Sequence, residues 1–105
     1  MKPRITAAVT AVHRWVPDKV LSNHDLERMV DTNDAWITER TGIKERRIMD
    51  RGVGTSEVGV RSVQALCAKR GIDPLEIDLL ICATVTPDHQ FPATANIICD
   101  RLGAR

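Results

Sequence analysis

The chain has 105 residues, of which 43% are hydrophobic and 28% charged, and its formal net charge is +1 with neutral histidines. This composition predicts a folded core and excludes disordered, collagen-like and disulfide-scaffold proteins, while the small net charge excludes polyanion binding through bulk charge. No apolar run approaches the roughly 20 residues of a membrane span, and the first residues do not lead into an apolar signal core. We therefore expect a cytoplasmic protein that does not associate with membranes.

The first half of the chain predicts two extended segments and two short helices. Small and β-branched residues before a Pro-Asp turn indicate the first strand, and the capping-box positions of Ser22 and Asp25 indicate the start of the first helix. Gly42 can end the second helix in a left-handed conformation. In chain order, the expected elements are a strand over Ile5–Val16, a helix from Ser22 to about Val30, a helix from Thr32 or Asn33 to Thr41, and an edge strand or extended segment over Ile43–Met49.

The second half predicts a long helix, a buried strand and a final helix. Apolar residues recur at helical spacing from Thr55 until Gly71, which ends that helix. Asp78–Val85 is a near-continuous apolar run, typical of a strand that is covered on both faces. Pro92 at the first helical position opens the last helix, and Gly103 closes it. This order of strands and helices predicts an α/β layered sheet.

The cysteines and histidines offer neither a nucleophile nor a metal site by their spacing. Cys67 and Cys99 lie on the apolar faces of expected helices and Cys82 lies within the expected buried strand, where a thiol behaves as an inert core residue. There is no C-x-x-C pair, and the three histidines are far apart in the sequence. We expect reduced cysteines and no bound metal.

A basic segment near the middle of the chain is a candidate binding site. Trp36 and Arg40 are four residues apart on an expected helix, so their side chains point the same way. An indole offers a flat face to a purine and a guanidinium binds phosphate bidentately, so the pair could clamp a nucleotide-like group; alternatively, Trp36 belongs to the core and the arginines form a solvated edge. The five basic residues here, against two acidic ones, are Arg40, Lys44, Arg46, Arg47 and Arg51. Because residues 55–105 carry five basic and six acidic residues, nothing extends this patch into a nucleic-acid surface.

One stretch of sequence resembles a known family. The run Val30–Ile48 (VDTNDAWITERTGIKERRI) is similar to the N-terminal signature of the β-ketoacyl-acyl-carrier-protein synthases III, the initiating condensing enzymes of type II fatty-acid synthesis in the thiolase-like superfamily. The similarity continues in order through most of the chain, at Ser22–Leu26, Gly71-Ile72, Leu79–Thr86, Phe91–Ala95 and Leu102–Ala104. It implies that residues 1–105 are the N-terminal portion of a thiolase-like domain, incomplete and without an internal boundary. The implied fold is the first part of a five-layer αβαβα arrangement, with a mixed sheet and covering helices.

The resemblance also implies site residues. Trp36 matches a tryptophan that stacks on the adenine of coenzyme A, and Arg40 matches an arginine that meets the phosphate end. Thr32 and Thr41 match positions that line the same nucleotide site. Phe91 matches a phenylalanine at the dimer interface that reaches toward the acyl pocket of the other subunit.

The implied activity joins an acyl-CoA primer to malonyl-acyl-carrier protein and releases 3-oxoacyl-acyl-carrier protein, CO2 and coenzyme A. It implies a homodimer that uses coenzyme A thioester as substrate and needs no cofactor. The family's nucleophilic cysteine and its His and Asn partners are expected beyond Arg105, so the 105 residues alone are expected to be inactive. The alternatives are a related thiolase-fold acyltransferase of the polyketide starter type and a non-catalytic fragment that binds coenzyme A.

Overall fold

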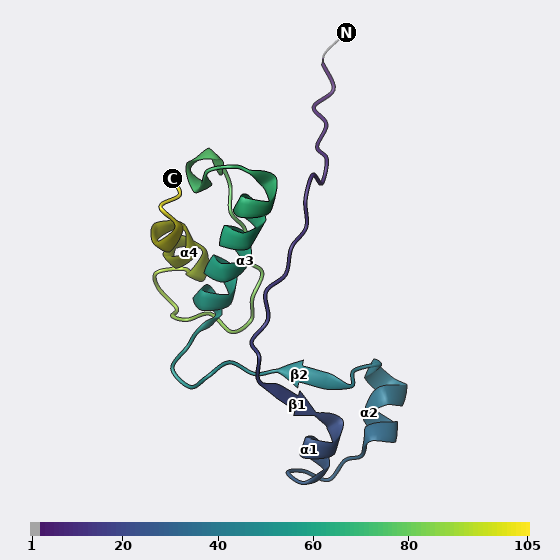
Figure 1. Ribbon diagram of the computed structural model, residues 1–105. Coiled ribbons are helices and arrows are strands. Elements are labelled where there is room, and N and C mark those ends of the chain that lie inside the picture. The colour runs from purple at the N-terminus through teal and green to yellow at the C-terminus, as the bar shows by residue number, and fades with distance from the viewer. Residues whose placement is uncertain (1–2) are drawn as a thin grey trace. The chain divides into compact units, whose positions relative to one another are not determined.

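The computed structural model describes residues 3–105, which form two short strands, four α-helices and one 3-10 turn. The elements are β1 (Val20–Ser22), α1 (Asn23–Glu27), α2 (Asp34–Thr41), β2 (Glu45–Arg47), α3 (Thr55–Arg70), η1 (Pro74–Glu76) and α4 (Thr94–Leu102) (Figure 1). They belong to two compact units: Val16–Val53 is one, and the chain up to Trp15 together with Gly54–Arg105 is the other. In the described part of the chain, no helix is long and apolar enough to cross a membrane.

The unit Val16–Val53 is built on a small antiparallel ribbon. β1 pairs with β2 in the register Val20 to Arg47, Leu21 to Arg46 and Ser22 to Glu45. The backbone ladder continues past both ends, because the Ile48 N–H donates to the Lys19 carbonyl at 2.9 Å and the Asn23 N–H donates to the Lys44 carbonyl at 3.1 Å. The edge strand expected within Ile43–Met49 is therefore confirmed.

Local sequence signals set the helix boundaries in this unit. At α1, the Ser22 hydroxyl accepts a bond of 3.1 Å from the Asp25 N–H, and the Asp25 carboxylate accepts one of 2.9 Å from the Ser22 N–H, so the capping box is confirmed. The helix is shorter than expected, ending at Glu27, and a turn continues to Val30. α2 ends as expected at Gly42, whose φ of 69° is in the left-handed region that favours glycine.

The other unit is organised around the packing of α3 against α4. Val60, Cys67 and Ile98 are its most deeply buried apolar residues. α3 ends at Gly71, as expected, but α4 begins at Thr94 instead of Pro92. The reason is the backbone of Ala93, which is extended with ψ of 143° and acts as the N-cap, so Pro92 lies outside the helix.

A side chain from a distant loop caps the start of α3. The N-cap residue is Gly54, which has no side chain to accept a bond. The Asp88 carboxylate accepts bonds from the Ser56 N–H at 2.8 Å and from the Ser56 hydroxyl at 2.5 Å, while the Asp88 N–H donates to the Thr94 hydroxyl at 3.1 Å. The bonds from Ser56 lower the pKa of Asp88, and a carboxylate is also favoured at a helix N-terminus. One carboxylate therefore joins the beginning of α3 to the beginning of α4.

Two expected strands are absent from the described residues, and these predictions were wrong for this structure. Residues 5–16 and 78–85 carry no sheet pairing, and the sheet that is present is two-stranded and antiparallel instead of mixed. Apolar side chains in both segments are exposed, among them Ile5, Ile81 and Val85. The physical reason is that a strand exists only through bonds to a neighbouring strand, and residues 3–105 provide none for either segment.

The close approach of α3 and α4 gives a testable prediction at Gly59. A Cβ at this position would overlap the Cδ1 atom of Ile98. Gly59→Ala should therefore lower the free energy of unfolding by about 1 kcal/mol, because overpacking outweighs the gain of about 1 kcal/mol in helix propensity. In an Ile98→Val background, which lacks Cδ1 but keeps Cγ1 at 3.0 Å from the added Cβ, the same substitution should be less destabilising. Urea unfolding of the four proteins measures this coupling, and an equal effect of Gly59→Ala in both backgrounds would contradict the packing.

Candidate functional site

Trp36 and Arg40 form an exposed aromatic and cationic pair on α2. The Arg40 Cζ atom lies 5.2 Å from the centroid of the Trp36 ring, within the range of a cation–π interaction. The spacing of four residues on one helix brings the two side chains together, as the sequence predicts. Trp36 is 53% exposed, so its ring does not belong to the core of this unit. The pair presents a flat face and a positive charge at the surface.

A hollow adjoins the Trp36 ring. It has a volume of about 180 Å³ and is lined by Asp31, Thr32, Asn33 and Trp36. Its shape is fixed in part by the N-cap of α2, where the Asn33 amide oxygen accepts a bond of 2.8 Å from the Trp36 N–H. Pockets that enclose a drug-sized molecule measure about 300–1,000 Å³. The hollow is therefore smaller than a pocket that would enclose a whole drug-sized ligand.

The other two predicted site residues lie in different settings. The Thr41 hydroxyl donates to the Ile37 carbonyl at 2.7 Å and accepts from the Ile43 N–H at 3.1 Å, so both of its bonding functions act in the turn that ends α2. Phe91 lies in the other unit, in the loop before α4, and is 89% exposed. Thr32 and Trp36 both line the hollow, and the Arg40 guanidinium lies over the Trp36 ring. The bonds of the Thr41 hydroxyl are made to the backbone at the end of α2.

A buried amide holds α2 in place. The Asn23 side chain is 1% exposed, and its Nδ2 group donates to the Asp34 carboxylate and to the Ile43 carbonyl, each at 2.8 Å. A longer bond of 3.4 Å from Nδ2 reaches the Thr38 hydroxyl, and the Asn23 Oδ1 atom accepts from the Arg46 guanidinium. Asn23 therefore connects the start of α1 to α2, to the segment after α2, and to β2.

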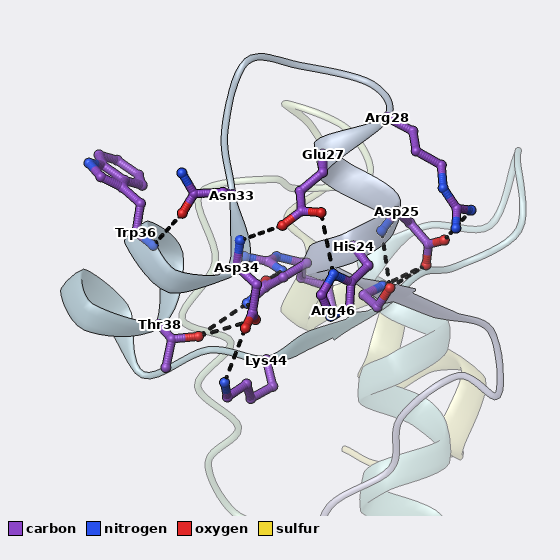
Figure 2. Close-up of polar contacts among 12 residues, drawn as sticks. His24, Asp25, Glu27, Arg28, Asn33, Asp34, Trp36, Thr38, Lys44 and Arg46 are labelled. Carbon is purple, nitrogen blue, oxygen red and sulfur yellow. Dashed lines mark hydrogen bonds and ion pairs between the residues drawn. The ribbon is translucent and has the colours of Figure 1, made fainter.

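Acidic side chains secure the N-terminal end of α2. The Glu27 carboxylate accepts a bond of 2.7 Å from the Asp34 N–H, and this bond lowers the pKa of Glu27. The pKa of Asp34 is also lowered, chiefly by the bond from Asn23 and further by the Lys44 ammonium, 3.5 Å away. Figure 2 shows these contacts around Asp34, with the Trp36 indole pointing away from them. Negative charge is favourable at a helix N-terminus, so these carboxylates stabilise the start of α2. The side of α2 that carries Trp36 makes none of these contacts and is exposed.

The basic segment 40–51 divides into cations with different surroundings. Arg46 donates to Asn23, and Arg47 pairs with Glu45 at 3.3 Å and donates to the backbone carbonyls of Pro17 and Asp18. These two arginines act within the unit, so the segment does not form a continuous phosphate-binding patch. Sequence patterns indicated the charge but not these inward contacts. Arg40, over the indole, is the arginine of this segment that adjoins the hollow through Trp36.

No metal or cysteine centre is present in residues 3–105. No three His, Cys, Asp or Glu side chains in this range gather to hold a metal ion. Cys67 is buried, while Cys82 and Cys99 are half-buried, and all three are free thiols.

Comparison with known proteins identifies relatives of the chain. The β-ketoacyl-[acyl-carrier-protein] synthase III of Natranaerobius thermophilus is 50% identical over 98 residues, which are 93% of this chain and 30% of the relative. The structure of the synthase III from Thermus thermophilus matches with a TM-score of 0.80 and 39% identity, over 94% of this chain and 32% of that one. The resemblance to β-ketoacyl-acyl-carrier-protein synthase III is confirmed. The α/β fold class is confirmed with it.

The match to synthase III covers one part of each relative. The chain spans about 30% of the length of the curated synthases III that it matches. A priming β-ketosynthase of a polyketide biosynthetic pathway is also similar, with a TM-score of 0.79 and 31% identity over 90% of this chain and 29% of that one. No family model matches the chain.

The bond between Asn23 and Asp34 gives a prediction about titration. Asn23→Ala should raise the pKa of Asp34 toward its ordinary value, because the Asn23 amide is the largest cause of the lowering. NMR titration of the carboxyl carbon measures this, with Ser22→Ala as a control that leaves the bond in place. Because Asp34 has a lower pKa in the folded state, its ionised form stabilises the fold above its unfolded pKa, and this contribution is lost as the pH falls through the folded pKa. The stability deficit of Asn23→Ala should therefore shrink in acid; an unchanged Asp34 titration in this variant would contradict the account.

Proposed function

We propose that the intact protein is a condensing enzyme that initiates fatty-acid synthesis. It joins an acyl-CoA primer to malonyl-acyl-carrier protein and gives 3-oxoacyl-acyl-carrier protein, CO2 and coenzyme A. The observation that carries the proposal is the exposed Trp36 ring, with Arg40 over it and a hollow beside it, in a chain about half identical to proteins named as synthases III. The cytoplasm is the proposed site of action.

In this proposal, the chain supplies the nucleotide end of the coenzyme A site. The adenine ring stacks on Trp36 in the hollow that Thr32 also lines, and the phosphates meet the Arg40 guanidinium. Thr41 contributes by fixing the end of the helix that carries Arg40, since its hydroxyl is engaged with the backbone. Phe91 lies at the interface of a homodimer, which gives an exposed loop phenylalanine a partner surface.

The chemistry of the proposed reaction is covalent catalysis. The acyl group passes from the sulfur of coenzyme A to a cysteine thiolate, and coenzyme A leaves. Malonyl-acyl-carrier protein then loses CO2, and the resulting carbanion attacks the acyl-enzyme carbonyl; the new C–C bond forms as the C–S bond to the cysteine breaks. We place the cysteine and its His and Asn partners outside these 105 residues. The 105 residues alone are then inactive, and the reaction uses no cofactor beyond the thioester.

A second candidate is a polyketide starter enzyme, favoured by the structural match to a priming β-ketosynthase. It would share the Trp36 and Arg40 pair as a nucleotide clamp, because both reactions begin from an acyl-CoA. The two candidates differ in the carrier protein that accepts the acyl group. Assay of the full-length protein with malonyl-acyl-carrier proteins from the two kinds of pathway separates them.

The clamp is tested by substrates with and without the nucleotide. In the full-length protein, Trp36→Ala and Arg40→Ala should each lower kcat/KM for acetyl-CoA about tenfold or more, since base stacking and charged hydrogen bonds contribute about 1–3 kcal/mol each. Neither should change kcat/KM for acetyl-pantetheine, which carries the same thioester without the nucleotide. Initial-rate kinetics with both substrates measure the difference.

Matched variants sharpen this test. Trp36→Phe keeps an aromatic face and should retain part of the acetyl-CoA activity, whereas Arg51→Ala removes an exposed arginine of the same segment and should leave both substrates unaffected. Equal losses with acetyl-CoA and acetyl-pantetheine, or no loss with either, would refute the nucleotide clamp.

A further inference from the structure

We infer that Asn23 is a positioning residue for coenzyme A binding: its buried amide holds α2 so that Trp36 and Arg40 face the coenzyme. This inference rests on the proposed function. It assigns a role in substrate affinity to a residue that does not touch the hollow and lies on a different helix.

One face of α2 contacts Asn23, and the opposite face carries Trp36 and Arg40. Asp34 and Thr38, four residues apart, both bond to the Asn23 amide, so they define the inward face. Trp36 and Arg40 are each two residues further along, which on an α-helix is a rotation of about 200°. The clamp therefore lies on the face opposite the Asn23 contacts. A rotation of α2 that breaks those contacts would also turn the clamp.

One side chain holds both ends of this short helix. The Asn23 amide reaches Asp34 at the first helical position and the Ile43 carbonyl just after the C-cap, each at 2.8 Å. Its own backbone is fixed by the bond from the Asn23 N–H to the Lys44 carbonyl. α2 has eight residues, and Ile37 is its single buried apolar residue. With so little apolar burial, polar contacts of this kind set the orientation of the helix.

The amide group is specific for this position. It donates from nitrogen to Asp34 and Ile43 and accepts at oxygen from Arg46, so it needs donor and acceptor on one planar group. A carboxylate in its place would accept from Arg46 but would face the Asp34 carboxylate without a donor. Among the buried side-chain polar atoms of the described residues, none lacks a partner. An apolar substitution at position 23 would remove the bonds that the Asn23 amide makes to Asp34, Ile43 and Arg46.

The test is a double-mutant cycle in the full-length protein. Asn23→Asp, almost the same shape, should raise KM for acetyl-CoA about tenfold while leaving kcat, KM for malonyl-acyl-carrier protein and the kinetics with acetyl-pantetheine within about twofold. In a Trp36→Ala background, Asn23→Asp should add less than its about tenfold effect in the unmodified protein, because the part that acts through the Trp36 ring is already lost and only the part that acts through Arg40 remains. Ser22→Ala is the control: it lowers stability by removing a helix cap but should not change KM for acetyl-CoA.

Each outcome decides between the claims. If Trp36→Ala raises KM for acetyl-CoA and Asn23→Asp does not, the positioning role is refuted and the clamp stands. If Trp36→Ala has no effect, the clamp itself fails. Equal loss with acetyl-pantetheine, or full additivity in the double mutant, would show a merely structural role and overturn the inference. If Asn23→Asp does not fold, Asp34→Ala removes the same bond from the α2 side, and it should raise KM for acetyl-CoA in the same selective way; an unchanged KM refutes the role.

Discussion

The buried Asn23 amide is the contact on which the candidate site depends. It joins four parts of the unit Val16–Val53, namely α1, α2, the segment after α2, and β2. The strand ribbon and the two short helices bury few apolar side chains, so they have little hydrophobic packing to fix their arrangement. A buried polar network that is fully bonded can specify one arrangement of such elements. The position of the Trp36 and Arg40 pair follows from that arrangement.

In the other unit, too, a single polar side chain connects separate elements, and there it is Asp88. Asp88 reaches back to the start of α3 and also bonds through its N–H to the first turn of α4. Gly54, as N-cap, makes room for it, since a Cβ there would lie 2.5 Å from the carboxylate. In both units a helix start is completed by a polar side chain from elsewhere in the chain. Such contacts fix loops as well as helices.

Local signals allowed much of the fold to be predicted from the sequence. The capping box of Ser22 and Asp25 and the glycines at 42, 71 and 103 act within a few residues, and each marked a helix boundary correctly. The spacing of Trp36 and Arg40 is also local, and their pairing was predicted. The predictions of strands over 5–16 and 78–85 were wrong for this structure, because a strand forms only by bonding to a neighbouring strand, which no local sequence pattern can supply.

The supporting contacts of the site were beyond the reach of sequence patterns. The partners of Asn23 lie between 11 and 23 positions away, and an isolated Asn in a short helix has no periodicity that marks it as buried. Arg46 was counted with a basic patch, although its charge is directed toward Asn23. The threonine at 41 was assigned to the nucleotide site by resemblance, and no sequence pattern indicated the bonds that its hydroxyl makes at the end of α2. Side-chain direction, which only the folded chain determines, separates these cases.

The most direct test of the central claim is photocrosslinking of the full-length protein with a coenzyme A analogue that carries an azide on its adenine. Trypsin cleavage after Arg28 and Arg40 releases the peptide Met29–Arg40, which contains Thr32 and Trp36. The account predicts that mass spectrometry finds the adduct on this peptide, and that free coenzyme A suppresses it whereas pantetheine does not. An adduct that is suppressed by coenzyme A but lies only on other peptides would contradict the account.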